Sequence, residues 1–493
     1  MSPALIVLGA FFVIAIGLAL ASRRGHDMNL EQWTLGGRGF GAMLVFVLMA
    51  GEIYTTFTFL GGSGWAYGRG APAFYILCYS TIAYTMSYFL LPAIWRYAQP
   101  RRLVSQADFF VAKYNSPALG ILVSLVGVAA LIPYLVLQLK GLGILVSESS
   151  YGAISSATAI WAGTIALVGY VVISGVRGSA WTAALKDVMI FAIVVAIGIY
   201  LPYHYYGGYG GMFRAIDQAK PGFLSLAPTG MSPTWVISTA ILSAFGFYMW
   251  PQYFASVYTA KSDDVFRKNA ALLPAYQLVV LFVFFAGFAA VLTVPGLTGS
   301  DADLSLLRVS KQTFNSWTVG LIGDAGLLTA LVPGSMILIT TTTIIAQNLY
   351  RAAVPAATDR TVARVARGLV PVIALIAAIM ALKGGAAIVS LLLMGYNFVT
   401  QLFPGMLLCL GDRPRVSTGA VFAGIVAGEA TVAYLSISNT TVAMLLPGAP
   451  QVFKDLNVGI VALLVNLAVT AIIGLVVRPK AVGDVALKPA HEL

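Results

Sequence analysis

Charge and cysteine are both scarce in this chain of 493 residues. Charged residues make up 10% of the chain and hydrophobic residues 59%, whereas a typical soluble domain has about 25% charged residues. So few charges cannot cover the surface of a water-soluble protein of this length, which excludes a large soluble domain. The composition therefore indicates an integral protein of a lipid bilayer.

The small numbers of cysteines and histidines exclude further classes of protein. Cys78 and Cys409 both lie in apolar segments, so a disulfide framework is not expected. His26, His204 and His491 lie at segment edges or in the tail, so we expect no metal site and no cofactor. The apolar segments contain no cysteine–histidine, serine–histidine or metal-spaced cluster, and we therefore do not expect an enzyme.

Long apolar windows recur along the whole chain. About 20 apolar residues are needed to cross the hydrocarbon core as a helix. The windows predict an all-α membrane protein with thirteen transmembrane helices, at 3–22, 41–62, 72–95, 117–146, 153–174, 181–203, 233–257, 270–295, 320–350, 368–383, 386–411, 416–438 and 457–478.

The basic residues are divided unevenly between the two sides of these spans. With the N-terminus outside, 20 of the 29 Lys and Arg residues fall inside and 7 fall outside. Basic residues concentrate in cytoplasmic loops, so we expect the C-terminus, including a tail at 481–493, in the cytoplasm of a bacterial-type cell. This distribution explains the net charge of +11 without a nucleic-acid partner. The first span is expected to be an uncleaved anchor, because its positive charges, Arg23 and Arg24, follow it.

One carboxylate interrupts the second predicted span. Glu52 lies within 41–62 with about ten uncharged residues on either side. A charge at this depth costs about 2.5–3.5 kcal/mol on insertion scales, and such residues usually serve a function. Glu52 therefore predicts a membrane protein that handles an ion, a proton or a polar solute.

Two spans carry helix-weakening residues at matching places. The second span runs into the glycine cluster at 61–64, and the seventh span, 233–257, carries Gly246 and Pro251 at mid-membrane depth. Backbone groups freed there need protein, water or a bound solute as partners. Each interrupted span opens a unit of five spans, and an odd number reverses the orientation of the second unit. The pattern predicts an inverted-repeat transporter with its site between two broken helices.

Several motifs resemble the sodium:solute symporter family over residues 1–480. They are LGGRGFGAM, TTFTFLGGSGWAYGRG, IPYLVLQLKGLG, SGVRGSAW, WPQ and NLYR. The run AGEIYTTFTFLGGSGWAY is most similar to the monocarboxylate permease branch. The resemblance implies a LeuT-like core of two inverted five-helix repeats, at 41–203 and 233–411, with accessory helices at 3–22 and 416–478. It also implies transport of lactate, pyruvate or alanine by alternating access around a midplane site, with a monomer as the functional unit.

The resemblance also implies that the usual sodium site is lost. Sodium-coupled members place two adjacent hydroxyl residues in the ninth span and an aspartate in the sixth. Aligned without gaps, these positions are Val332, Pro333 and Ala183, and none has a side-chain oxygen. A sodium ion needs several oxygens in place of its hydration shell, so we expect proton-coupled or sodium-independent transport.

Two alternatives stay open. A shifted alignment would bring hydroxyls from Ser335 or 340–343 into the ninth-span positions, and the protein would then be a sodium symporter with displaced ligands. A membrane sensor is less consistent with the sequence, because only about fifteen residues follow the last span and carry no signalling domain.

The resemblance implies a coupling site around Glu52. Gly51 and Tyr54 are the positions whose carbonyls would face the ion in sodium-coupled relatives. Glu52 is the first candidate to take up and release a proton, and Lys186 is the second, because an ammonium can occupy the place and charge of a missing cation. Alternatively, Glu52 is a structural carboxylate paired with Lys186, Lys140 or backbone donors, and Lys186 extends to the cytoplasmic surface.

The predicted substrate-binding residues are polar or aromatic side chains in or near the interrupted spans. Lys140 would neutralise a substrate carboxylate or, alternatively, belong to a permanent ion pair. Asn397 and Gln401 lie one helical turn apart and either line the pathway or bridge helices. The full predicted set is Lys140, Gln138, Thr55, Thr58, Ser63, Tyr248, Trp250, Gln252, Asn397 and Gln401.

Overall fold

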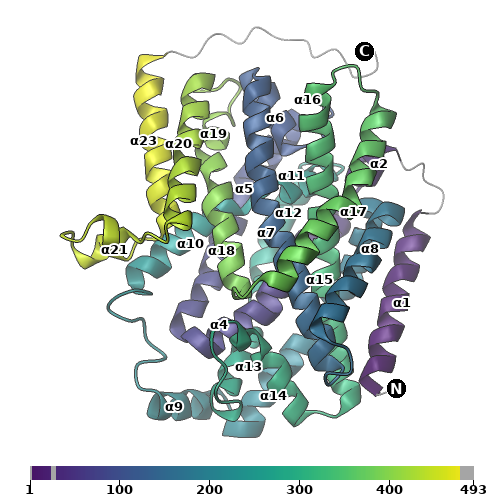
Figure 1. Cartoon of the computed structure of the whole chain (residues 1–493), viewed down its shortest axis with the longest axis vertical. Coiled ribbons are helices and arrows are strands. Elements are labelled where there is room, and N and C mark those ends of the chain that lie inside the picture. Colours follow the sequence, from purple (N-terminus) through teal and green to yellow (C-terminus); the bar gives the residue numbers. More distant parts are fainter. Residues whose placement is uncertain (1–2, 24–28, 478–493) are drawn as a thin grey trace.

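The computed structural model describes residues 3–23 and 29–477, and the predicted tail at 481–493 lies outside these residues. The secondary structure described is helical, apart from one isolated bridge between Phe40 and Ala260. Most helices lie along the long axis of the molecule (Figure 1), as apolar helices do when their backbone groups must be satisfied inside lipid.

The helices follow one another in two successive series and an accessory group. The first part of the chain forms α1 (Pro3–Arg23), α2 (Leu30–Leu35), η1 (Gly36–Arg38), α3 (Ala42–Gly51), η2 (Phe57–Gly61), α4 (Gly62–Arg69), η3 (Ala71–Phe74), α5 (Tyr75–Ala98), α6 (Gln106–Tyr114), α7 (Pro117–Ser149) and α8 (Ser156–Tyr206). The second part forms α9 (Tyr209–Ala219), α10 (Pro233–Phe247), α11 (Pro251–Tyr258), α12 (Asp264–Gln277), α13 (Val280–Thr293), η4 (Gly299–Leu304), α14 (Ser305–Thr313), α15 (Ser316–Ile344), η5 (Ile345–Tyr350), α16 (Arg351–Ala353), α17 (Asp359–Lys383), α18 (Ile388–Val399), η6 (Thr400–Leu402) and α19 (Phe403–Leu408). The last part forms α20 (Thr418–Ile437), α21 (Val442–Leu445), α22 (Gln451–Lys454) and α23 (Val458–Val476).

Ten helices among the described residues are long and apolar enough to cross a membrane. One of them, α8, has 51 residues and a kink at Gly175, whose φ of 57° is a left-handed conformation that suits glycine. The predicted broken spans do not count as long helices, because their apolar pieces, α3 and α10, are short. The number of thirteen spans stays a prediction.

The first broken span is interrupted earlier than the glycine cluster predicts. Helix α3 ends at Gly51, and the chain leaves the helix before it re-enters a wide helical turn at Phe57. Gly61 and the two glycines that follow it lie in helical turns beyond the break. The break therefore frees the carbonyls around Glu52, at the depth where the carboxylate lies.

The second broken span is interrupted between Phe247 and Pro251, as the sequence predicts. Pro251 is the first residue of α11, where a missing N–H costs no hydrogen bond. Gly246 stays helical, and a Cβ at this position would lie 2.1 Å from the Thr400 Oγ1 atom. Gly246 therefore permits close packing of α10 against η6 rather than forming the break itself.

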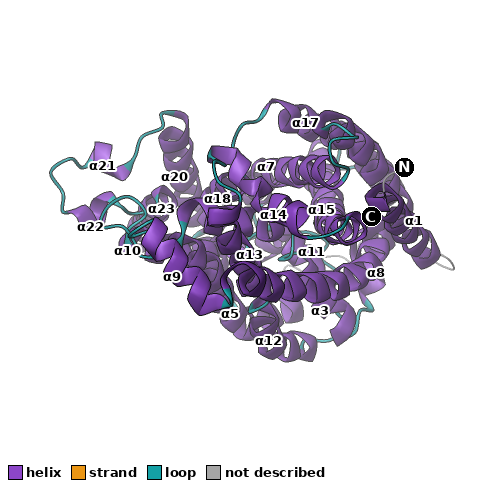
Figure 2. Ribbon diagram, turned by 90° about the horizontal axis from the view of Figure 1, so that it is seen from below, coloured by secondary structure: helices purple, strands orange, loops and turns teal. Residues whose placement is uncertain are grey.

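The two ends of the bundle carry different elements. Helices α6 and α16 lie at one end, here called the α6 face, and α9 and α14 lie at the opposite end, here called the α9 face (Figure 1). Figure 2 shows the accessory helices α20–α23 gathered beside α10 and α18, while α1 lies on the other side of the bundle against α8 and α15. The two breaks lie in the interior between these accessory elements.

Candidate functional site

The Lys186 ammonium lies inside the first break. The side chain of Lys186 is 0% exposed, and its Nζ atom donates hydrogen bonds to the carbonyl oxygens of Gly51, at 2.8 Å, and Tyr54, at 3.0 Å. A third acceptor, the Asp187 Oδ1 atom, lies 3.2 Å away. Three acceptors match the three N–H donors of an ammonium. Lys186 thus occupies the break and does not extend to the cytoplasmic surface.

The positions predicted as lost sodium ligands surround this ammonium. A Cβ built on Gly51 would lie 3.3 Å from the Ala183 Cβ atom and 3.8 Å from the Val332 Cγ1 atom. Together with Val47, these two side chains form a small apolar cluster. Pro333 is buried in α15 beside them. The Lys186 ammonium and the Gly51 and Tyr54 carbonyls therefore lie next to apolar side chains. Ala183 and Val332 contribute no side-chain oxygen there.

Three of the displaced hydroxyls of the ninth span have other partners, whereas the hydroxyls of Thr340 and Thr343 have none among the described residues. The Ser335 Oγ atom lies 2.7 Å from the Ser179 Oγ atom and donates to the Val332 carbonyl at 2.6 Å. The hydroxyls of Thr341 and Thr342 donate to carbonyls of their own helix. The hydroxyls of Ser335, Thr341 and Thr342 are therefore bound elsewhere than at the Lys186 ammonium.

Glu52 is enclosed in the break but has no ion-pair partner within 4.0 Å among the described residues. It is 2% exposed, and neither carboxylate oxygen has a hydrogen-bond partner there. The Gln252 side chain lies beside the carboxylate, and the charge of Lys186 acts on it from nearby. A fixed structural pair of Glu52 with Lys140 or Lys186 is therefore not what holds this carboxylate in place.

Two buried amides near the break have unused donors. The Gln138 Oε1 atom accepts a hydrogen bond from the Thr56 hydroxyl at 2.8 Å, and the Gln138 Nε2 atom has no partner among the described residues. Neither polar atom of the Gln252 amide has a hydrogen-bond partner among the described residues other than the nearby Glu52 carboxylate. An unsatisfied buried amide is costly, so these groups are suited to meet a bound solute.

The hydroxyl groups predicted to bind substrate mostly bond to their own backbone. The Thr58 hydroxyl donates to the Ile53 carbonyl, and the Ser63 hydroxyl donates to the Phe59 carbonyl at 3.0 Å. The Thr55 hydroxyl accepts from the Phe57 N–H at 3.1 Å. These bonds stabilise the irregular backbone after the break and leave the hydroxyls less available to a substrate.

Aromatic side chains enclose the polar groups. The Trp250 ring lies 4.9 Å from the Tyr134 ring and 5.4 Å from the Tyr396 ring, and the Tyr134 hydroxyl donates to the Glu52 carbonyl at 3.3 Å. The Tyr248 hydroxyl is buried and has no partner among the described residues. Aromatic walls exclude water and leave room for few polar contacts, as in most solute sites.

The remaining predicted residues lie apart from the break. The Lys140 ammonium donates to the Ala386 carbonyl, just before α18. Gln401 donates to the Asn397 carbonyl and accepts from Asn466 of α23, so it bridges helices. The Asn397 Oδ1 atom is buried and has no hydrogen-bond partner in the part of the chain that the structure describes.

Four residues at the site were not predicted from the sequence: Asp187, Thr56, Tyr134 and Tyr396. Asp187 carries a detectable signal, because it is a second ionisable residue next to Lys186 in an apolar span. The two tyrosines and Thr56 carry none, because such residues are common in membrane helices. An apolar groove of about 450 Å³ between α10 and α23 lies elsewhere and has no ionisable lining residue.

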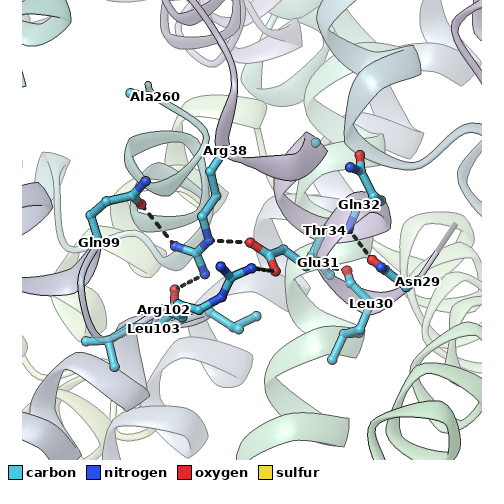
Figure 3. Close-up of polar contacts among 12 residues, drawn as sticks. Asn29, Leu30, Glu31, Gln32, Thr34, Arg38, Gln99, Arg102, Leu103 and Ala260 are labelled. Carbon is cyan, nitrogen blue, oxygen red and sulfur yellow. Dashed lines mark hydrogen bonds and ion pairs between the residues drawn. The ribbon is translucent and has the colours of Figure 1, made fainter. Parts of the chain in front are cut away.

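An ion cluster joins the segment before α3 to the segment after α5 (Figure 3). The Glu31 carboxylate pairs with the Arg38 Nε atom at 2.6 Å and with Arg102. The Arg38 guanidinium also donates to the Leu103 carbonyl at 2.9 Å. Burial alone would raise the pKa of Glu31, but hydrogen bonds from Arg102 and Arg38 hold it below its usual value. The cluster restrains the helix that leads into the break.

Comparisons with known proteins agree on the family and the fold. The model of the sodium:solute symporter family matches residues 33–428. The chain is 57% identical over 478 residues to the uncharacterised symporter YhjB of Bacillus subtilis, covering 97% of this chain and 98% of that protein. It is 29% identical over 373 residues to a monocarboxylate transport permease protein of Rhizobium johnstonii, covering 74% of each.

A solved Na⁺-coupled sialic acid symporter has the same fold. It superposes with a TM-score of 0.79 at 16% identity, covering 97% of this chain and 98% of that one. The fold is that of the LeuT-like transporters. The chain is a multi-pass membrane symporter and belongs to the sodium:solute symporter family.

Proposed function

We propose that this symporter imports small monocarboxylates, such as lactate or pyruvate, by proton-coupled or otherwise sodium-independent transport. The observation that carries the proposal is the Lys186 ammonium bound to the Gly51 and Tyr54 carbonyls, where the family resemblance implies sodium. A tethered ammonium neutralises these carbonyls and Asp187 without an ion from solution. Sodium would have to displace a buried lysine to bind at the same place.

Glu52 is the proposed proton-carrying group. Its carboxylate is buried beside the Gln252 amide and has no ion-pair partner within 4.0 Å among the described residues. Two carboxylates at close range cannot both be ionised easily, so a monocarboxylate would enter most favourably when Glu52 carries a proton. The protonated group would then donate a hydrogen bond, and substrate and proton would move together.

Neutral donors would recognise the substrate carboxylate. The Gln138 Nε2 atom has no hydrogen-bond partner among the described residues, and the Gln252 amide lies beside the Glu52 carboxylate. Lys140 is bound to the Ala386 carbonyl, so the amides replace it in this role. The similarity to a monocarboxylate transport permease supports this substrate class.

The test is uptake of radiolabelled lactate and pyruvate into proteoliposomes, with a proton gradient or a sodium gradient imposed separately. We expect accumulation driven by protons and indifferent to sodium. Glu52→Gln should abolish proton-driven accumulation but retain exchange of substrate across the membrane. The matched control is Glu429→Gln, which removes another carboxylate from a membrane helix, in α20, away from the break.

Each contrary result has a definite meaning. A requirement for sodium would overturn the coupling proposal and favour a sodium symporter with displaced ligands. Unchanged proton-driven accumulation in Glu52→Gln would overturn the role of Glu52. Uptake of neither acid under either gradient would overturn the substrate class.

A further inference from the structure

Two ionisable residues form hydrogen bonds with the backbone at the beginning of α18. The Asp303 Oδ2 atom, from η4, accepts a hydrogen bond from the Ile388 N–H at 3.0 Å. The Lys140 ammonium, from α7, donates to the Ala386 carbonyl two residues earlier. Asp303 is 1% exposed. An acidic group at a helix N-terminus and a cation on a free carbonyl are both favourable contacts, and together they hold one turn of backbone from two sides.

This turn lies directly against η2 and α4, the part of the first broken span that follows the break. A Cβ built on Gly61 would lie 3.0 Å from the Val389 side chain and 3.1 Å from the Ile388 side chain. A Cβ on Gly64 would lie 2.8 Å from the Asp303 Oδ1 atom. The glycines therefore allow η4 and the start of α18 to close tightly on η2 and α4, the elements that lead from the α9 face to Glu52.

We propose that Asp303 and Lys140 form a latch that closes the transport site toward the α9 face, and that release of this latch admits substrate from that face. Neither residue contacts the site directly, so both are positioning residues. Such a latch requires only alternating access between two faces, which symporters of this fold use. It depends neither on the substrate class nor on the driving ion.

The electrostatics of the latch make it sensitive to pH. Burial raises the pKa of Asp303 to about 6, although the Ile388 N–H and the Lys140 ammonium both lower it, and Asp301 raises it slightly. A released, hydrated Asp303 would titrate near its ordinary value of 3.8. The closed latch thus binds a proton more tightly than the open one. Acid favours the closed latch, and rising pH through about 6 favours its release.

The test uses a thiol under the latch. Val389 is 0% exposed and covers Gly61, so Val389→Cys is placed in a background with Cys78→Ser, which removes an exposed native thiol. A membrane-impermeant maleimide is applied to each side of proteoliposomes in turn. We expect slow labelling from one side only, and about tenfold faster labelling in Asp303→Ala and Lys140→Met, because a hydrogen bond to a charged group is lost.

Two control variants distinguish release of the latch from a general loss of structure. Asp301→Asn changes an exposed aspartate of the same turn and should leave the labelling rate unchanged. Asp303→Asn keeps a hydrogen-bond acceptor without the charge. In this variant the cysteine at position 389 should be labelled slowly, and its labelling rate should not depend on the pH. Equal labelling rates in Asp303→Ala, Lys140→Met and the parent would overturn the latch. If the cysteine variant does not fold, hydrogen exchange of residues 386–391 can be compared between Asp303→Ala and Asp301→Asn. Equal exchange rates in these two variants would likewise overturn the proposal.

Discussion

The Lys186 ammonium donates a 2.8 Å hydrogen bond to the carbonyl oxygen of Gly51, the last residue of α3. The carbonyls at a helix C-terminus lack intrahelical partners and carry partial negative charge, so a cation is favourable there. In this protein the cation is covalently attached to α8. The contact joins the broken span to a neighbouring helix, and changes in it should affect both stability and transport.

Replacing Lys186 with methionine should destabilise the protein by about 3–5 kcal/mol, because Asp187 and two carbonyls would stay buried without their partner. A thermal unfolding assay in detergent measures the effect. The double variant with Asp187→Asn should recover part of the loss, because the buried charge is then removed. An equally unstable double variant would contradict the view that the ion pair with Asp187 matters.

Removing the Gln138 amide should weaken substrate binding more than it slows transport. In Gln138→Leu the free Nε2 donor is lost together with the acceptor for Thr56, so we expect KM to rise about tenfold, as for a lost hydrogen bond to a charged group. Concentration-dependent uptake measures KM. Gln401→Leu, which breaks a bridge to α23 instead, should leave KM nearly unchanged, and an equal rise in both variants would contradict the assignment.

The Glu31 cluster should loosen in acid. The two arginines hold the pKa of Glu31 below its usual value, so its stabilising effect is complete above that value and is lost as the pH falls through the lowered pKa. Hydrogen exchange in α2, corrected for the intrinsic exchange rate at each pH, should therefore rise at low pH in the parent. Glu31→Gln should show this faster exchange already at neutral pH, and slow exchange there would contradict the role of the cluster.

Accessibility under the latch should follow the titration of Asp303. Its pKa of about 6 in the closed state predicts that labelling of Val389→Cys rises between pH 5 and 7 and changes little at higher pH. The measurement is the initial maleimide rate, corrected for the reactivity of a free thiol at each pH. A corrected rate that falls over this range would reverse the predicted sign.

The bridge between Gln401 and Asn466 should matter for stability rather than coupling. The Asn466 Nδ2 atom donates to the Gln401 carbonyl at 2.7 Å, which ties α23 to η6. Asn466→Leu removes a buried bond and should cost about 1–3 kcal/mol. Thermal unfolding measures the cost. The ratio of transported substrate to coupled ion should not change, and a changed ratio would assign this helix a part in transport.

Much of this architecture could be predicted from local sequence. Hydrophobic windows indicate membrane helices because each span must satisfy its own backbone groups in lipid. Pro251 marks where the second broken span resumes as a helix, and it can be read directly from the sequence. The depth of the first break was less predictable: the glycines at 61–64 turned out to serve close packing, and the helix ends at Gly51 instead.

The partners of the buried charges were decided by the tertiary structure. Lys186 reaches a carbonyl 135 residues away, and Lys140 reaches one 246 residues away. Both lysines lie in apolar helices, and sequence alone left open whether each faces the site, a loop or the membrane surface. The side of a helix that turns inward depends on how it packs against helices distant in the chain. The folded bundle therefore places one lysine at the break and the other at the latch.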